Sequence, residues 1–377
     1  MPFTFLHTAD WQIGKAFGSL PKEVAIALTE ARLGAIDRLA DQAERSGARH
    51  VLVAGDIFET ETLSPKTVRQ ALARMGRHRD LVWHLLPGNH DAHRPGGLWE
   101  QLLAEEPPGN LRAHLAPSPS EIDPGVWLLP APLTGRASAI DPTAYYDAIS
   151  TPSGALRIGL AHGSVHGFGS DGDAAINISP NRAAIARLDY LALGDWHGVK
   201  QIEPRTWYSG TPEPDRFATN EPGHALVVRI EAAGAPPDVQ RVRTAQFAWV
   251  RRELALRASN DLMALEAAVD AAAERPSDVL VQLVLSGRVT AGDRQEIGRR
   301  LKALDASLRY LDVDLSELTL KASDSNLEPL GAGGELRWVG EQLAKLIAEP
   351  SPEKSAVASE ALTLLLELAA EAGGAGS

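Results

Sequence analysis

The chain has 377 residues, of which 44% are hydrophobic and 23% are charged, and its formal net charge is -12 at pH 7. This length can hold one large domain and a smaller one. The absence of cysteine excludes disulfides, zinc–thiolate sites and cysteine nucleophiles, and it is typical of the reducing cytoplasm. The negative charge argues against a protein that coats nucleic acid through bulk electrostatics, but not against a metal-dependent nuclease. Because the N-terminus has no basic signal-peptide start and no apolar run is long enough to cross a bilayer, we expect a cytoplasmic protein with no membrane contact.

The first ninety residues predict alternating strands and helices, with each strand ending in a polar loop. Ser64 followed by Pro65 is typical of a helix start, with serine as the N-cap and proline in the first turn. Loops that follow the strands of an α/β sheet are where ligands commonly bind. The expected strands are 3–8, 50–54 and 81–86, and the expected helices are 22–46 and 65–75.

The alternation continues less regularly to a domain boundary near residue 246. Strands are expected at 156–161 and 190–193, with a short helix between them capped by Ser179, and antiparallel strands follow at 225–230 and 239–242. After Trp249 the pattern reads strand 250–256, helix 261–274, strand 279–285, helix 293–304 and strand 308–320. The prediction is therefore a first domain at 1–246, a small α/β domain at 247–325, and a linker with amphipathic helices at 326–377.

Five short blocks place Asp, Asn, Gln or His directly after predicted strands. Taken alone, a strand-end aspartate is often a helix cap, and a lone histidine is usually a satisfied polar residue. All five blocks in one chain, each after an apolar run, favour a metal site over that structural interpretation. The blocks are Asp10-Trp11-Gln12, Gly55-Asp56, Gly88-Asn89-His90-Asp91, His162-Gly163 and Gly194-Asp195-Trp196-His197.

The order of these blocks resembles that of the calcineurin-like binuclear metallophosphoesterases. Within that family the chain is most similar to the SbcD-type DNA repair nucleases, and in particular to their stand-alone bacterial relatives. The blocks at 7–11 and 208–214 and the small α/β part after Trp249 support the narrower match. The resemblance covers 3–320 and implies an αββα sandwich followed by a small α/β cap domain.

The resemblance also implies two metal ions and their ligands. One metal would be held by Asp10, Gln12, Asp56 and His197, and the other by Asp56, Asn89, His162 and Asp195, so that Asp56 bridges them. His90 would act on the phosphate, by stabilising charge or by protonating the leaving oxygen, and Asp91 would orient the His90 ring.

The chain departs from the family pattern at two of these positions. Gln12 and Asp195 stand where the family usually has histidine. One interpretation is a degraded site, but both replacements keep an oxygen that can coordinate. Because carboxylate and amide oxygens suit harder cations than imidazole does, we expect two Mn²⁺ ions, with the Gln12 site the weaker.

Three further residues lie in loops beside the blocks and are candidates for phosphate contacts: His93, Arg94 and His166. Each is equally interpretable as a solvated loop residue. Trp11 and Trp196 flank the expected ligands, and we interpret them as packing residues, with base stacking as the alternative.

The expected function is a metal-dependent DNA nuclease in DNA repair that prefers single-stranded DNA and cuts internal sites, with exonuclease activity as the alternative mode. A small-molecule phosphodiesterase or phosphatase would use the same ligands. A third possibility is a repair scaffold with a degenerate metal site. The expected partners are DNA and either a repair ATPase or helicase or a second copy of the chain.

Overall fold

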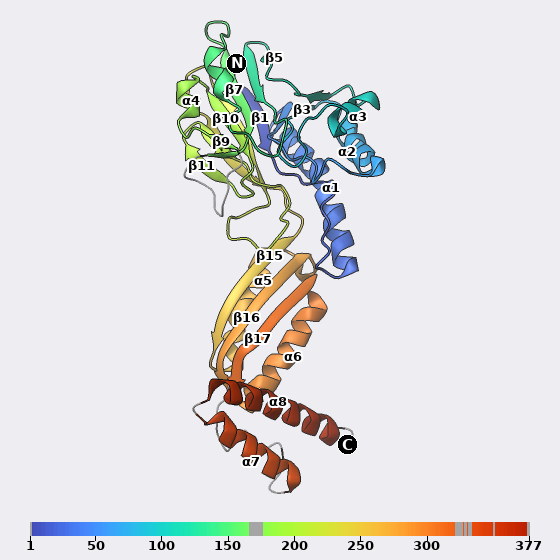
Figure 1. Ribbon diagram of the computed structural model, residues 1–377, viewed down its shortest axis with the longest axis vertical. Helices are drawn as coiled ribbons and strands as arrows, with labels where there is room; N and C mark the ends of the chain where they lie inside the picture. The colour runs from blue at the N-terminus through green and yellow to red at the C-terminus, as the bar shows by residue number, and fades with distance from the viewer. Residues whose placement is uncertain are drawn as a thin grey trace. The chain divides into compact units, whose positions relative to one another are not determined.

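The computed structural model describes residues 2–165, 176–320, 327, 330, 334–349 and 351–374. The chain divides into two compact units, Met1–Phe247 and Ala248–Ser377 (Figure 1). Within the described residues, no helix combines the length and the apolar composition needed to span a membrane.

The first unit contains two six-stranded sheets. In the first sheet, β1, β2, β3 and β4 are parallel, and β13 runs antiparallel to β1. Its order is β14 (Asp238–Arg243), β13 (His224–Ile230), β1 (Phe3–Thr8), β2 (His50–Val53), β3 (Val82–Leu85) and β4 (Leu111–Ala113). The second sheet has the order β11 (Lys200–Glu203), β12 (Thr206–Tyr208), β10 (Tyr190–Gly194), β7 (Leu156–His162), β6 (Val126–Ala131) and β5 (Ser120–Asp123).

Alternation along the strands lets the two sheets pack face to face. Side chains such as Leu52 of β2 and Ile158 of β7 share one buried cluster between the sheets. The other face of the first sheet, with Val51, packs under the helices, and the outer face of the second sheet buries Leu191. The layers therefore form an αββα sandwich. The helices and short elements of this unit are α1 (Lys22–Arg45), α2 (Pro65–Arg77), α3 (Leu98–Ala104), η1 (Ala144–Ala148), α4 (Arg182–Ile185), β8 (Ser164–Val165) and β9 (Asn177–Ile178).

One predicted helix cap is confirmed and another is wrong. The Ser64 hydroxyl accepts a hydrogen bond from the backbone N–H of Thr67, with Pro65 in the first turn of α2. The short helix α4 instead has Asn181 at its N-cap position. Ser179 turns away, because its backbone N–H donates to Asp141 and its hydroxyl donates to Asn181.

The second unit has a three-stranded parallel sheet, β15 (Ala248–Leu256), β16 (Val279–Val289) and β17 (Tyr310–Leu320). Its core contains Val281 and Leu283 of β16, Ile297 of α6 and Leu362 of α8. Because Leu362 is buried in that core, α8 packs on its own unit. The remaining elements are η2 (Ser259–Leu262), α5 (Met263–Ala272), η3 (Pro276–Asp278), α6 (Ala291–Ser307), α7 (Glu335–Ile347) and α8 (Pro352–Gly374).

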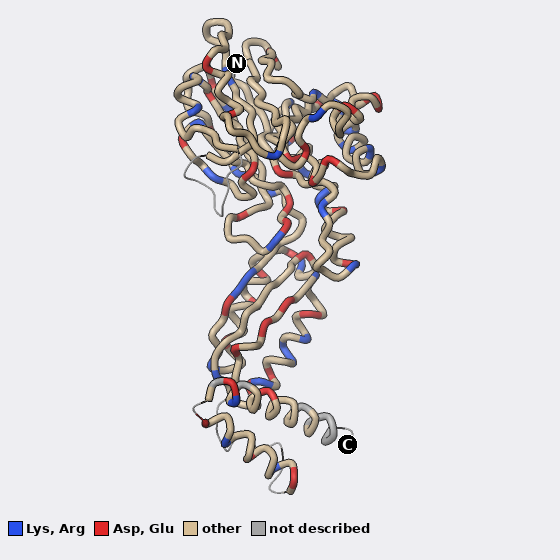
Figure 2. Tube along the Cα trace, in the orientation of Figure 1, with Lys and Arg blue, Asp and Glu red and all other residues tan. Residues whose placement is uncertain are grey.

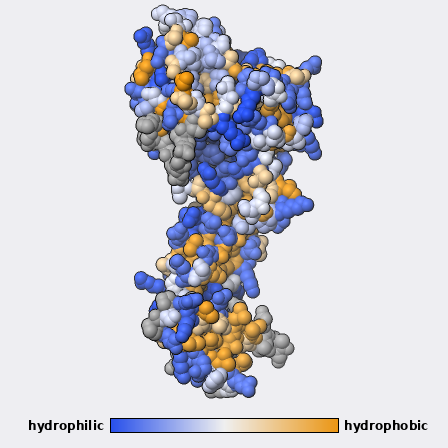
Figure 3. Space-filling view, viewed as in Figure 1, coloured by the Kyte–Doolittle hydropathy of each residue, from blue (hydrophilic) through white to orange (hydrophobic). Residues whose placement is uncertain are grey.

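The C-terminal helices also carry exposed apolar side chains. Trp338 on α7 and Leu364 on α8 are 63% and 58% exposed. Orange surface gathers over this end of the second unit in Figure 3. This apolar surface contrasts with the mainly hydrophilic visible face of the first unit.

Candidate metal centre

The predicted blocks meet at the carboxyl ends of the strands. Asp10 follows β1, Asp56 follows β2, Asn89 follows β3, His162 ends β7 and Asp195 follows β10. Since these strands run parallel to their neighbours within each sheet and the two sheets face each other, their ends deliver the blocks to one edge of the sandwich.

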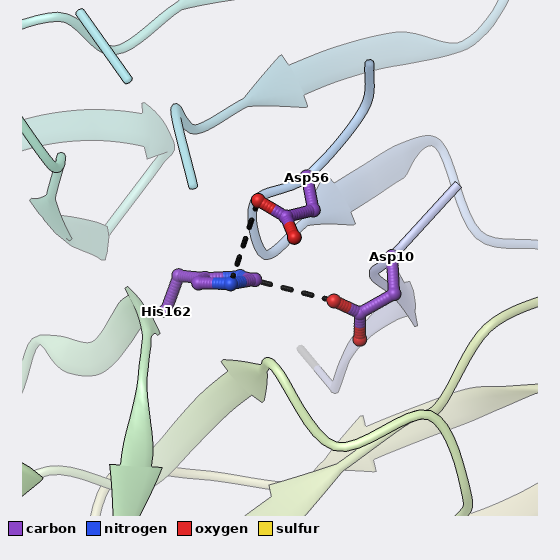
Figure 4. A group of neighbouring side chains, drawn as sticks. All are labelled: Asp10, Asp56 and His162. Carbon is purple, nitrogen blue, oxygen red and sulfur yellow. Dashed lines mark ion pairs between the residues drawn. The ribbon is translucent and has the colours of Figure 1, made fainter. Parts of the chain in front are cut away.

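Asp10, Asp56 and His162 form the tightest group. Their ligand atoms all lie within 4.8 Å of one another, and the three side chains point toward a common centre (Figure 4). Each residue is at most 2% exposed. Two buried carboxylates this close repel each other in a low-dielectric interior, and a bound cation would relieve that repulsion.

The His162 ring is fixed by a backbone carbonyl. Its Nδ1–H donates to the carbonyl of Ala54 at 2.8 Å, so Nε2 is the nitrogen that can offer a lone pair to a cation once it has lost its proton. That nitrogen faces Asn89 Oδ1 at 2.9 Å, Asp56 Oδ1 at 3.6 Å and Asp195 Oδ1 at 3.8 Å. These four residues are the second predicted ligand set, and the structure brings them together.

The Asn89 amide provides a test of the metal interpretation. Its oxygen faces only acceptors, and a half-turn of the amide would let the nitrogen donate to His162 Nε2 and to both oxygens of Asp56. In the present orientation the Asn89 oxygen lies beside His162 Nε2 and both Asp56 oxygens, an arrangement that a cation bound by all three side chains would favour. The donor set therefore fits a divalent cation.

Gln12 gives a second test. Its amide nitrogen donates to Asp56 Oδ2 at 2.9 Å, while its buried Oε1 has no hydrogen-bond partner among the described residues. A buried acceptor without a donor is costly, and a cation bound beside Asp56 would satisfy it. The amide thus suits the weaker ligand role predicted for it.

His197 lies outside the tightest group and beside a carboxylate that the sequence interpretation missed. Its Nδ1 is 3.4 Å from Asp215 Oδ2, which also lies 3.2 Å from Lys15 Nζ. Burial opposes ionisation of Asp215, but His197, Arg32 and Lys15 outweigh it and hold the pKa of Asp215 well below its ordinary value. Asp215 follows directly after the block at 208–214, and this position was the sequence signal that could have identified it as a residue of the site.

Backbone strain concentrates at the proposed ligands. Among the described residues, seven non-glycine residues have positive φ, and four of them are Asp10, Gln12, Asp56 and Asp195, with φ of 54°, 50°, 53° and 105°. Each such conformation costs about 1–3 kcal/mol and persists only where the surroundings impose it. The same surroundings that strain these residues aim their oxygens at one centre.

Two glycines in the blocks allow this convergence. A Cβ on Gly55 would lie 2.3 Å from His162 Nδ1, and a Cβ on Gly88 would lie 2.1 Å from Asp56 Oδ1. Both contacts are far too short, so only glycine fits at these two positions. These glycines are therefore required by the close approach of the side chains proposed to bind metal.

Comparison with known proteins shows the family of the chain. Residues 3–229 match the calcineurin-like phosphoesterase family. The chain belongs to this family. It is 24% identical over 306 residues to a Bacillus subtilis protein named uncharacterized metallophosphoesterase YhaO, covering 75% of this chain and 72% of that protein. It is also similar to the crystal structure of TT1561 of Thermus thermophilus, with 11% identity and a TM-score of 0.41, over 65% of this chain and all of the other.

This calcineurin-like phosphoesterase is thus a metal-dependent phosphoester hydrolase, and His90 lies at the open side of its centre. The His90 side chain is 43% exposed, and its Nε2 is 4.0 Å from Asp56 Oδ2. Its Nδ1–H donates to the carbonyl of Glu59 at 3.0 Å. The ring is therefore held with Nε2 available to a substrate.

The role predicted for Asp91 is wrong. Its two oxygens accept hydrogen bonds from the backbone N–H groups of Gly88 and Phe58, and it is fully buried. Burial, together with the charge of Asp56, raises the pKa of Asp91 to about 7. Asp91 therefore ties the Asn89–His90 loop to the loop after β2, and the Glu59 carbonyl orients His90.

The remaining predicted residues are less directly connected to the centre. Arg94 lies 3.4 Å from Glu61, and His93 Nε2 lies 3.8 Å from Glu100. His166 falls outside the described residues. Trp11 is 1% exposed and donates from Nε1 to Thr8, which excludes base stacking by that ring in this conformation.

The charges of the centre predict a pH-dependent metal affinity. Burial alone would lower the pKa of His162, but Asp56, Asp10 and Asp195 outweigh it and raise that pKa to about 9. In the metal-free protein the Nε2 proton must therefore leave before a cation can bind. We expect metal affinity, measured by competition with a chromogenic chelator, to rise by up to about tenfold per pH unit between about pH 6.5 and pH 8.5. An affinity that stays constant over this range would contradict the raised pKa of His162 in the metal-free protein.

Proposed function

We propose that this protein is a Mn²⁺-dependent DNA nuclease that prefers single-stranded DNA and cuts it at internal sites. The observation that carries the proposal is the placement of His90, half-exposed beside a buried carboxylate-rich centre, with Nε2 4.0 Å from Asp56 Oδ2. A DNA diester has an alkoxide leaving group, which needs a proton as the P–O bond breaks. His90 is placed to supply it.

The chain's own residues divide the work between binding and proton transfer. When bound, two divalent cations would activate a water molecule and stabilise charge on the phosphate. Asp10, Asp56 and Asp195 would supply the negative charge that holds them. When protonated on both ring nitrogens, His90 would donate its Nε2–H to a phosphate oxygen or to the leaving oxygen, and the Glu59 carbonyl would keep the ring in place.

The preference for a single strand follows from the pairing of cationic side chains near the centre with carboxylates, which leaves them little charge for binding DNA. Lys15 lies near Glu59 and Asp215, and Arg94 lies near Glu61. Lys and Arg alternate with Asp and Glu along the trace instead of forming a continuous basic stripe (Figure 2). Because rigid duplex projects its phosphates poorly into a recessed site, a flexible strand should reach the metals more readily. Binding to a repair ATPase or helicase, or self-association, would extend cleavage to other DNA forms.

The donor set predicts which metal supports activity. Gln12 and Asp195 offer oxygen where related enzymes have imidazole, and oxygen donors favour Mn²⁺ and Mg²⁺ over Zn²⁺. We expect hydrolysis of a chromogenic phosphodiester to be fastest with Mn²⁺ in a divalent-metal screen. Gln12→His should improve the relative performance of Zn²⁺. Fastest hydrolysis by the wild-type enzyme with Zn²⁺ would contradict this prediction.

The role of His90 predicts a loss of catalysis without loss of metal. His90→Ala should keep its bound metals, measured by mass spectrometry, and lose roughly 10²–10⁴-fold in the rate of DNA cleavage. The loss should be smaller for an aryl phosphodiester, whose leaving oxygen scarcely needs a proton. The matched control is His93→Ala in the same loop, for which we expect a smaller effect. An equal loss on both substrates would instead assign charge stabilisation to His90.

The substrate preference predicts the outcome of a gel assay on three forms of DNA. With Mn²⁺, linear and circular single strands should both be cut, blunt duplex should be cut poorly, and added salt should slow cleavage. A circular single strand has no end, so its survival alongside degraded linear strands would show an exonuclease. Turnover of cyclic nucleotides with no cleavage of any DNA would favour the small-molecule alternative.

A further inference from the structure

A second cavity lies in the first unit, away from the metal centre. Its volume is about 570 Å³, which is within the range of small-molecule sites. Residues at the amino-terminal ends of β7 and β10, together with two turns, form its walls. Those that matter here are Arg157, Arg187, Leu188, Asp189, Glu203 and Arg205.

Arg157 donates only to neutral acceptors. Its Nη1 donates to the carbonyl of Ile149 and the hydroxyl of Thr151, and its Nη2 donates to the carbonyls of Tyr146 and Ala186. These bonds hold the guanidinium rigidly in the wall. They leave its charge without a carboxylate.

Arg187 is held in a strained conformation beside it. Its φ is 52°, at the position after α4 where its N–H donates to Ala184 and the next N–H, of Leu188, donates to Ala183. Glycine or asparagine is the favoured residue at such a helix end. The presence of arginine at a strained position points to a use for its side chain.

The nearby carboxylate does not neutralise this pair. Asp189 accepts from the backbone N–H groups of Arg157 and Gly234 and lies 3.4 Å from Arg205 Nη1. Burial, and then the charge of Arg187, lower the pKa of Arg157, and the charge of Asp189 offsets them only in part. Within the described residues neither Arg157 nor Arg187 forms an ion pair with a carboxylate, although the whole chain carries a net charge of -12.

We propose that this cavity binds a small molecule that carries a phosphate group, of about the size of a mononucleotide. The exposed Arg187 guanidinium would bind the phosphate through paired hydrogen bonds. Arg157, whose Nη atoms already donate to the protein, would add positive charge, and the exposed Ala184 would contact the rest of the molecule. Glu203 also lines the cavity and weakens anion binding there. The site is distinct from the metal centre, because β7 separates Arg157 from His162 by five residues, or about 17 Å.

The test is calorimetric titration of the full chain with deoxyadenosine 5′-monophosphate and, as its uncharged counterpart, deoxyadenosine. Each titration is run with Mn²⁺ and again with a chelator, so that binding at the metal centre is separated from binding at this cavity. The decisive variant is Arg187→Gly, which removes the charge and also relieves the strain at φ 52°, so its fold should be retained. Arg79→Ala, at an exposed position outside the cavity, is the control for loss of one positive charge.

We expect the monophosphate, and not the nucleoside, to bind in the presence of chelator. Arg187→Gly should weaken that binding about tenfold or more, since a hydrogen bond between charged groups is lost. Arg79→Ala should bind like wild type, and Glu203→Gln should bind more tightly. Equal binding by wild type and Arg187→Gly, equal binding of nucleoside and monophosphate, or no binding at millimolar concentration would each overturn the proposal.

Discussion

The mutual repulsion of buried carboxylates is the constraint on which the first unit depends. Asp10 and Asp56 are at most 2% exposed and lie with His162 inside a 4.8 Å group. Such an arrangement is unstable by itself in a low-dielectric interior. The surrounding fold must therefore hold these side chains in place, and a positive charge, of protonated His162 or of a bound cation, must offset theirs.

The fold holds them with backbone groups more than with side chains. The Asp10 carboxylate accepts from the backbone N–H of Asp195, and Asp56 accepts from that of His90. Ala54 fixes the His162 ring. Because these partners are rigid main-chain atoms at strand ends, the ligands are pre-organised before any metal binds.

A buried arginine network joins this centre to the rest of the unit. Arg32 of α1 donates to the carbonyls of Trp11, Glu213 and Pro214. The Glu213 carboxylate accepts from the backbone N–H groups of Gln246 and Phe247, the last residues of the first unit. The block at 208–214 therefore has a structural role, since it links α1, the first ligand loop and the end of the unit.

The sequence predicts the strand-end positions of the ligands because strand periodicity and glycine-flanked polar blocks are local signals. The Ser64 cap is predictable for the same reason. The partners of His90 and His197 are not, because Glu59 and Asp215 act through the conformation of loops that no local pattern specifies. Asp91 illustrates the limit: it adjoins His90 in sequence, yet its oxygens accept from Gly88 and Phe58.

The central claim is that one bridging carboxylate, Asp56, holds two divalent cations. The most direct test is the metal content of purified protein reconstituted with Mn²⁺, measured by mass spectrometry, for wild type, Asp56→Ala and the exposed control Asp41→Ala. The account predicts two ions per chain for wild type and the control, and none for Asp56→Ala. That variant should remain folded, because it loses one of the repelling charges. Two ions retained by a folded Asp56→Ala, or none bound by wild type, would contradict the account.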